Sequence, residues 1–237
     1  MSGVFQFKQF AVDQTGCAMK INTDGVLLGA FANAENAQNI LDIGTGTGVI
    51  ALMLAQQFLS AQIYAVEVDE PAALTAAKNF QNSSFVDRLK VYQQDFQTYF
   101  AENPGKRYDL IISNPPFFLN SLESPKANKT VAKHTDKAFF EELIRVIAKH
   151  LTENGLCWLI LPLQSAELVK ELSVLNDLFL RRIVTVYSFE HSIPHREILS
   201  LGLSRSEAEN SKLVIYESIG NYTAEYKQLL KPYFIAF

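Results

Sequence analysis

Short apolar runs alternate with segments of helical periodicity along most of the chain. The runs at 39–43, 62–68, 89–92 and 108–113 predict strands, because each is short, apolar and bounded by turn signals. Helices are predicted between them at 48–57 and 71–82, and Pro71 suits the first turn of the second helix. Strand and helix in regular alternation predict a mostly parallel sheet with helices on both faces.

The second half of the chain continues this alternation and then becomes richer in strands. A helix is predicted at 138–151, with Asn154-Gly155 as its C-terminal cap. A strand at 156–161 and a helix at 165–176 follow. Strands are then predicted at 182–188, 197–204 and 213–217, and a last helix at 222–230. Ligands of such α/β sheets bind beyond the carboxyl ends of the strands, so functional motifs are expected there.

Composition and charge narrow the class of protein. Apolar residues make up 48% of the 237 residues and charged residues 19%, which is typical of a globular protein and excludes extended disorder. The net charge of −4 means that any RNA or DNA contact must use a local basic patch. Cys17 and Cys157 lie far apart, so neither a zinc site nor a disulfide framework is expected. The longest apolar run, 156–163, is too short to cross a membrane. We therefore expect a cytoplasmic protein with no metal and no membrane contact.

Three glycines follow the first predicted strand, in Asp42-Ile43-Gly44-Thr45-Gly46-Thr47-Gly48. Glycines permit a tight turn and let a ligand approach the backbone. A dinucleotide-binding Gly-x-Gly-x-x-Gly fingerprint would require a third glycine where the chain has Val49 or Ala51. The acid at Asp42 disfavours a pyrophosphate and suits the amino group of a methionine moiety. The motif resembles the first motif of class I S-adenosylmethionine methyltransferases, which implies cofactor contacts at Asp42, Gly44, Thr45, Gly46 and Gly48.

Two further strand ends carry acids. Glu67, followed by Val68, ends the second strand, where a carboxylate can accept hydrogen bonds from both ribose hydroxyls. Nicotinamide enzymes place an acid similarly, so Glu67 does not discriminate by itself. Asp95-Phe96 follow the third strand. In the resembling methyltransferases an acid here contacts the adenine amino group and an apolar neighbour packs on the ring. Asp95 is also a good helix N-cap, and both roles are compatible.

The most specific motif is Asn114-Pro115-Pro116-Phe117, which directly follows the strand at 108–113. Proline fixes the backbone and has no N–H to donate, so the nearby carbonyls remain available as acceptors. The Asn114 amide oxygen is a second acceptor, and two acceptors side by side suit a planar amino group. Phe117 can hold a base by stacking. Hydrogen bonds to the amino group would free the nitrogen lone pair for attack on a sulfonium methyl group. Positioning and electrostatics then supply most of the catalysis, without a strong general base.

The chain resembles the bacterial tRNA(Val) adenine-N6 methyltransferases over nearly its whole length. The resemblance rests on the motifs above and on the stretches 5–10, 17–20, 23–30, 193–196 and 221–223. It implies a Rossmann-like class I fold, with a mostly parallel seven-stranded sheet and one antiparallel late strand. It also implies S-adenosylmethionine as cofactor, the adenosine following the anticodon of tRNA(Val) as substrate, and no obligate protein partner. We expect one domain spanning 1–237, with 1–36 capping the cofactor and 37–237 as catalytic core. Lys20, Thr23 and Asp24 are then candidates for the methionine end of the cofactor, although Thr23-Asp24 also suits a helix cap.

Two clusters are candidates for RNA contact. The segment 124–137 follows the Asn114 motif and holds four lysines and one acid, so a mobile basic loop is predicted that binds phosphates or is simply a solvated surface. Its candidate residues are Lys126, Lys129 and Lys133, and Phe118, which precedes the segment, is a further candidate for RNA contact. His195 and Arg196 form the second cluster, where Arg196 suits a phosphate, a base or a structural ion pair equally.

Alternative acceptors remain open on the motif alone. The Asn-Pro-Pro-aromatic motif is shared by enzymes that act on DNA adenine, rRNA guanine N2 and a protein glutamine amide, and many adenine-N6 enzymes have tyrosine where this chain has Phe117. A third class, a non-enzymatic RNA-binding protein on the same fold, ranks last because every expected motif residue is present.

Overall fold

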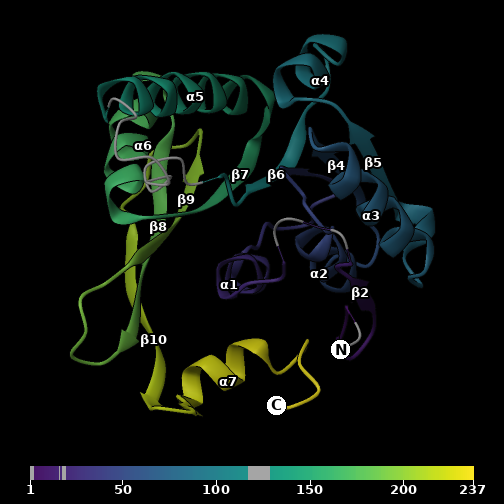
Figure 1. Cartoon of the computed structure of the whole chain (residues 1–237). Coiled ribbons are helices and arrows are strands. Elements are labelled where there is room, and N and C mark those ends of the chain that lie inside the picture. Colours follow the sequence, from purple (N-terminus) through teal and green to yellow (C-terminus); the bar gives the residue numbers. More distant parts are fainter. Residues whose placement is uncertain (1–2, 16, 18–19, 117–128) are drawn as a thin grey trace.

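A mixed sheet forms the centre of the computed structural model, which describes residues 3–15, 17, 20–116 and 129–237, with backbone only for 129–136 (Figure 1). Nine strands of this described part hydrogen-bond into the sheet. In spatial order they are β11 (Asn221–Tyr222), β10 (Glu209–Ser218), β8 (Phe179–Phe189), β9 (Arg196–Gly202), β7 (Leu151–Leu161), β6 (Tyr108–Ser113), β3 (Asn39–Ile43), β4 (Gln62–Glu67) and β5 (Leu89–Gln93).

The strand directions match the expected mostly parallel sheet. β5, β4, β3, β6 and β7 run parallel to one another, and β8 pairs in parallel with β10. β9 is antiparallel to both β7 and β8 and is the predicted antiparallel late strand. The seven strands from β5 to β8 make up the expected sheet. β10 and β11 extend it to nine, so the expected number of strands was too low.

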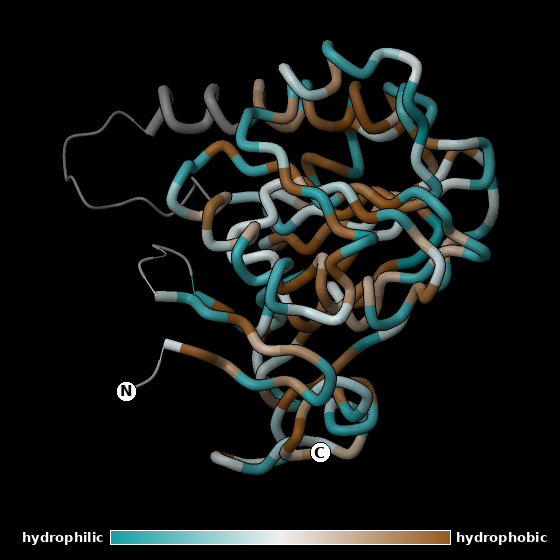
Figure 2. The backbone as a smooth tube through the Cα atoms, turned by 90° about the vertical axis from the view of Figure 1, so that its right-hand side faces the viewer, coloured by the Kyte–Doolittle hydropathy of each residue, from teal (hydrophilic) through white to brown (hydrophobic). Residues whose placement is uncertain are grey.

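Helices cover both faces of the sheet (Figure 1). One face carries α1 (Thr23–Phe31), α2 (Val49–Gln57), α3 (Glu70–Gln81) and α7 (Ala224–Leu230), together with the small sheet of β1 (Val4–Gln6) and β2 (Ala11–Asp13). The other carries α4 (Phe96–Glu102), α5 (Lys129–His150) and α6 (Leu163–Leu175). A single 3-10 turn, Val86–Arg88, precedes β5. Each face has its own apolar cluster against the sheet, and Figure 2 shows hydrophobic backbone positions gathered in the interior.

The helix before β7 differs most from its prediction. It begins at Lys129 rather than at residue 138, so the part of the predicted basic loop from 129 to 137 is helical. It ends at His150, and β7 begins at the next residue, so Asn154-Gly155 lie in a strand and do not cap a helix. A Cβ on Gly155 would lie 2.7 Å from the Tyr108 carbonyl oxygen. This glycine therefore permits a close approach of β7 to β6, where the register shifts.

Several short elements were not predicted, namely β1, β2, α1, α4 and β11. The first residues of α1 contain the predicted Thr23-Asp24 cap, but the cap is Asn22, whose side chain accepts a hydrogen bond from the Gly25 N–H at 2.8 Å. Thr23 and Asp24 lie in the first helical turn. The apolar residues of α1 do not favour one face, because the helix is buried between α2 and α7, and so no amphipathic period marks it.

The strand order reverses between β3 and β6. The chain moves outward from β3 through β4 to β5 and then returns to pair β6 with the other side of β3. Such a reversal leaves a crevice at the carboxyl edge, between the loops after the two central strands. The glycine motif follows β3 and Asn114 follows β6, so the topology brings the two principal motifs to this crevice. Among the described residues, no helix has the length and apolar character needed to span a membrane.

Candidate active site

The glycine turn after β3 depends on backbone angles that favour glycine. Gly44, Gly46 and Gly48 have φ of 72°, 57° and 83°. The Gly44 N–H donates to the Val66 carbonyl at 2.8 Å, and the Gly46 N–H donates to Glu67 Oε2 at 2.8 Å. A Cβ on Gly48 would lie 2.5 Å from the Phe80 ring, whereas a Cβ on Gly44 or Gly46 would meet nothing within 4 Å. Gly48 therefore serves helix packing, and the other two leave open space in front of the backbone.

Asp42 lies beneath this turn and is fully buried. Its Oδ2 accepts a hydrogen bond from Thr45 Oγ1 at 2.6 Å, while Oδ1 has no hydrogen-bond partner among the described residues. Burial raises the pKa of Asp42 to about 7, and the nearby Glu67 carboxylate also raises it. The predicted contact between Asp42 and a cofactor amino group stays a prediction, because Asp42 is beneath the turn rather than on the wall of the cavity described below.

Glu67 ends β4 and faces the same turn. Its Oε2 holds the Gly46 N–H, and its Oε1 accepts from the Asp69 N–H at 2.9 Å. Each carboxylate oxygen can accept more than one hydrogen bond, so Glu67 can fix the turn and still bind a hydroxyl donor. Its predicted ribose contact is compatible with this geometry and is not tested by it.

Asp95 is the N-cap of α4. Its Oδ1 accepts from the Thr98 N–H at 2.7 Å and its Oδ2 from Thr98 Oγ1 at 2.8 Å. These hydrogen bonds, the backbone one first, lower the pKa of Asp95. The capping role considered from the sequence is therefore present. Phe96 is buried next to it and packs edge-on against Phe139 of α5, at 5.6 Å between ring centroids.

Asn114 stands at the carboxyl end of β6. The preceding Ser113 anchors the strand end, because its Oγ donates to the Ile43 carbonyl of β3 at 2.8 Å. The Asn114 Oδ1 is buried and has no hydrogen-bond partner among the described residues. A buried amide oxygen without a partner costs free energy, typically about 1–3 kcal/mol. The described groups of the protein therefore leave one hydrogen-bond acceptor unused at the end of β6.

A cavity of about 440 Å³ joins these strand ends, within the size range of small-molecule sites. The predicted site residues in its lining are Gly44, Gly46, Glu67, Val68, Asp95, Phe96, Asn114, Pro115 and Pro116. Sequence reasoning missed the others, which are Cys17, Ile43, Val66, Asp69, Ala72, Gln94, Gln97, Ser113 and Phe139. Most of these directly adjoin a motif residue in the sequence, which is a usable signal. Cys17 lies in the 17–20 stretch that carries the family resemblance, within the segment expected to cap the cofactor, whereas Phe139 comes from a distant segment and carries no signal.

The remaining predicted residues are not part of this lining. Thr45 and Gly48 shape the glycine turn from outside it, Lys20 is exposed, and Thr23 lies in the first turn of α1. Phe117, Phe118 and Lys126 lie outside the described residues, as do the side chains of Lys129 and Lys133.

Asp24 and Arg196, predicted for cofactor and RNA respectively, contact each other. Arg196 Nε lies 2.8 Å from Asp24 Oδ2, and both side chains are largely buried. The ion pair considered as an alternative for Arg196 is therefore present, and it joins α1 to the start of β9. His195 precedes it, and burial, followed by the Arg196 charge, lowers the pKa of His195. RNA contacts by His195 and Arg196 stay predictions.

A larger hollow of about 850 Å³ lies at the opposite, amino-terminal edge of the sheet. Its lining includes Glu35, Asp109 and Arg181 but none of the predicted site residues. We assign the site to the smaller cavity, because its lining includes Asn114, whose buried Oδ1 has no partner among the described residues, and the glycine backbone with open space in front of it. Among the described residues, no group of three or more His, Cys, Asp and Glu side chains is arranged to hold a metal ion.

Sequence comparison with known proteins identifies the family of this chain. The model of the methyltransferase small domain family matches residues 21–181. A protein of Pedobacter heparinus named tRNA1(Val) (adenine(37)-N6)-methyltransferase is 50% identical over 237 residues, with all of both chains covered. This chain belongs to that methyltransferase family. A Bacteroides fragilis protein of the same name is 38% identical over 98% of this chain and 97% of its own.

Solved structures support the fold of this methyltransferase. A predicted O-methyltransferase from Agrobacterium tumefaciens superposes with a TM-score of 0.66 at 18% identity, and the match covers 89% of this chain and 96% of that one. At that identity the likeness concerns the fold alone.

Proposed function

We propose that this methyltransferase transfers a methyl group from S-adenosylmethionine to the N6 of adenine 37 in tRNA1(Val). The observation that carries the proposal is the buried Oδ1 of Asn114, which has no partner among the described residues and belongs to a residue that lines the cavity together with the glycine turn and Glu67. The 50% identity to the Pedobacter heparinus enzyme over the full chain supports the choice of acceptor. Adenine 37 is the nucleotide that follows the anticodon, in agreement with the substrate that the sequence resemblance implies.

The lining of the cavity suits S-adenosylmethionine, whose sulfonium supplies an activated methyl group. The open backbone at Gly44 and Gly46 admits the amino-acid portion close to the chain. Glu67 has acceptor capacity left for ribose hydroxyls, and Asp95 and Phe96 are placed to bind and flank a purine. The carboxylates also offset the positive charge of a bound sulfonium.

Asn114 and Pro115 then act on the acceptor. The Asn114 Oδ1 and the Pro115 carbonyl accept hydrogen bonds from the two N–H groups of the adenine amino nitrogen. This directs the nitrogen lone pair toward the methyl group and holds the two reactants in line. Methylation leaves the nitrogen cationic and acidic, so water is a sufficient proton acceptor. Phe117, next in the motif, is proposed to stack on the flipped base.

The wider arrangement is also part of the proposal. Residues 1–237 act as one domain, in which 1–36 close the cofactor side and 37–237 carry the catalytic groups. The tRNA approaches from the carboxyl edge of the sheet, where Lys126, Lys129 and Lys133 are candidates for phosphate contact. We place the reaction in the cytoplasm, where tRNA is the available substrate.

A labelled-methyl assay with three acceptors tests the proposal. Unmodified tRNA1(Val), a release factor and duplex DNA are each incubated with the enzyme and labelled S-adenosylmethionine, and the products are digested and identified by mass spectrometry. We expect N6-methyladenosine in the tRNA alone, and its loss when adenine 37 is replaced by guanine. Label in the release factor, in guanine N2 or in no acceptor would overturn the substrate assignment.

A further inference from the structure

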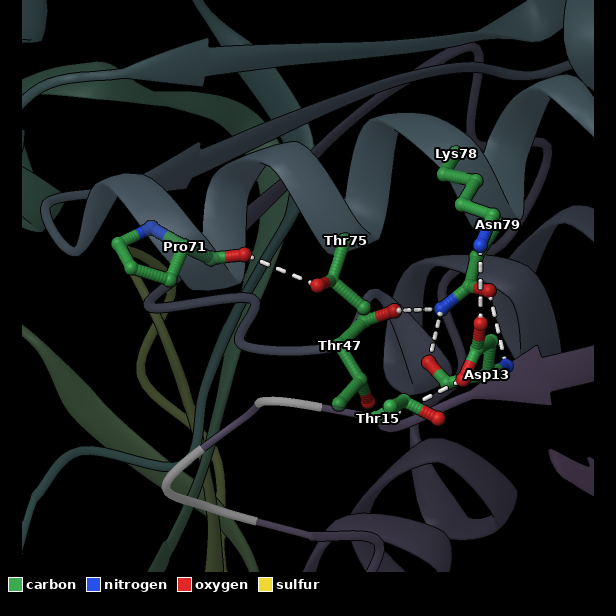
Figure 3. Close-up of polar contacts among 7 residues, drawn as sticks. All are labelled: Asp13, Thr15, Thr47, Pro71, Thr75, Lys78 and Asn79. Atoms are coloured by element: carbon green, nitrogen blue, oxygen red, sulfur yellow. Dashed lines mark hydrogen bonds and ion pairs between the residues drawn. The ribbon is translucent and has the colours of Figure 1, made fainter. Parts of the chain in front are cut away.

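Asn79 is a buried amide on α3 that bonds to two other segments of the chain. Its Oδ1 accepts a hydrogen bond from the Asp13 N–H at 2.9 Å. Its Nδ2 donates to the Asp13 carbonyl at 2.9 Å and to the Thr47 carbonyl at 2.8 Å. Figure 3 shows the Asn79 side chain between the backbones of these two residues. Both amide hydrogens are therefore used, and the side chain links α3, the end of β2 and the glycine turn.

An asparagine at this position would destabilise the fold if its side chain made no hydrogen bonds. Asparagine is a weak helix former, and Asn79 lies inside α3 with an exposed fraction of 2%. A polar group buried to this degree destabilises the fold unless it is hydrogen-bonded. The three bonds satisfy it completely. Removing the side chain would leave two carbonyls and one N–H without this partner.

At one end, Asn79 binds Asp13, the last residue of β2, and the chain that follows β2 reaches the cavity. Cys17, four residues after Asp13, is buried and forms part of the cavity wall. Gln14, the residue after Asp13, holds this part of the chain through two hydrogen bonds: the Cys17 N–H donates to its carbonyl at 3.4 Å, and the Ile21 N–H donates to its Oε1 at 2.9 Å. The position of Asp13 is therefore coupled through Gln14 to the position of Cys17 in the lining of the cavity.

The other end of the link is the glycine turn. Thr47 lies between Gly46, which lines the cavity, and Gly48, which packs against Phe80. Its carbonyl is the part of the turn that Asn79 holds. One side chain thus bonds to the turn on one side of the cavity and to the strand that leads to Cys17.

We propose that Asn79 is a positioning residue for the cofactor, because it fixes the Cys17 wall relative to the glycine turn. This rests on the proposed function, in which the cavity binds S-adenosylmethionine. Asn79 does not itself line the cavity, so it acts through the two backbone segments that it holds. Its loss should weaken cofactor binding far more than it slows methyl transfer at saturating cofactor.

Three substitutions of Asn79 remove its hydrogen bonds to different extents. N79S keeps one hydroxyl and should raise the Kd for S-adenosylmethionine about threefold, and N79A should raise it about tenfold, since the loss of more hydrogen bonds frees the two backbone segments to a greater degree. N79D retains the acceptor for the Asp13 N–H but turns both donors into a carboxylate facing two carbonyl oxygens. Its Kd should rise further at pH 8 than at pH 5.5, where a protonated carboxyl regains one donor.

Two controls separate positioning from general stability. K78A alters the neighbouring residue and removes its 3.0 Å ion pair to Asp13, but leaves all three Asn79 bonds. L172A removes a buried side chain from α6, on the opposite face of the sheet. K78A should bind cofactor like the wild type. L172A should be destabilised at least as much as N79A, with an unchanged Kd.

The experiment measures the S-adenosylmethionine Kd by calorimetry for all five variants and the wild type, with the urea midpoint and kcat at saturating cofactor beside it. A raised Kd in N79A and N79S, with kcat within about threefold of the wild type, supports the proposal. An unchanged Kd in folded N79A or N79S overturns it, as does an equal rise in L172A. Failure of the wild type to bind S-adenosylmethionine would instead contradict the proposed function.

Discussion

The two sides of the cavity differ in how their polar groups are satisfied. On the glycine side, the groups that shape the turn are largely paired within the protein. The Gly46 N–H bonds to Glu67, the Thr45 hydroxyl to Asp42, and the Thr47 carbonyl to Asn79. On the Asn114 side, the amide oxygen is buried without a partner among the described residues, and the following prolines have no N–H to offer.

We interpret this difference as a division of roles. The paired groups keep the glycine turn in its conformation, and Asn114 retains an acceptor for a ligand. A turn that is internally bonded keeps its backbone open to a cofactor without rearrangement. In the proposed function, the Asn114 acceptor, which no described residue satisfies, gains its partner when the amino group of the substrate binds. Asp42 Oδ1 is an exception on the glycine side, since it is buried and has no partner in the described part of the chain but lies beneath the turn. The following predictions test which class each residue belongs to.

The largest effect is expected from titrating Asp42 without cofactor. Burial raises its pKa from 3.8 to about 7. The folded protein therefore binds more protons than the unfolded chain between these values, and stability must fall as pH rises through this window. Each pKa unit of difference corresponds to about 1.4 kcal/mol, so the full loss approaches about 4 kcal/mol.

The D42N variant isolates this contribution. Its amide oxygen can still accept from Thr45 but does not titrate. The difference in unfolding free energy between wild type and D42N, measured by urea at pH 4 to 8, should shift steadily in favour of D42N as pH rises. A difference that stays constant across this range would show that Asp42 is ionised in the free protein.

The next effect concerns Gly48. Alanine there must adopt a φ of 83° and place its Cβ 2.5 Å from the Phe80 ring. The left-handed conformation costs about 1–2 kcal/mol and forced repacking about 1–3 kcal/mol. G48A should therefore lose about 3 kcal/mol of stability in urea unfolding. G105A is the matched control, because its Cβ would meet nothing within 4 Å. Equal midpoints for the two variants would contradict the packing role of Gly48.

The smallest effect is expected from the Asp24–Arg196 ion pair. Its side chains are 14% and 25% exposed, and such partly screened pairs contribute roughly 1 kcal/mol or less. A double-mutant cycle with D24N and R196Q should give a coupling free energy of that size. The KM for tRNA should remain unchanged in both single variants. A raised KM with a weaker salt dependence in R196Q alone would instead assign Arg196 to RNA contact.

The sequence predicted the fold best for the short central strands, which are buried on both faces of the sheet. The strands at 39–43 and 108–113 match β3 and β6 residue for residue. The failures have physical causes. Gly155 suggested a helix end because glycine is common at helix C-termini, whereas here it lets two strands approach closely. The lysines from 129 onward suggested a loop, yet charged residues form helices readily.

The sequence predicted those site residues that lie at or directly after the carboxyl end of a strand. Gly44, Gly46, Glu67, Asp95 and Asn114 all line one cavity, as parallel strands place their carboxyl ends together. The contribution of Phe139 was not predictable, because this residue reaches the cavity from α5 through tertiary packing, whereas Cys17 lies in the 1–36 segment that was expected to cap the cofactor. Asn79 gave no signal either, since its importance lies in three backbone partners that the sequence does not reveal.

The most direct test of the account is single-turnover methylation of tRNA by N114A at saturating S-adenosylmethionine. N176A serves as the control, because its amide caps α6 by donating to the Leu172 carbonyl at 2.8 Å. Loss of one preorganised hydrogen-bonding group at a reacting centre slows catalysis by about 100–1000-fold. We predict a decrease of that size for N114A, with its cofactor Kd nearly unchanged and N176A at the wild-type rate. An N114A rate within about threefold of the wild type would contradict the central claim that the unpartnered Asn114 oxygen binds the amino group.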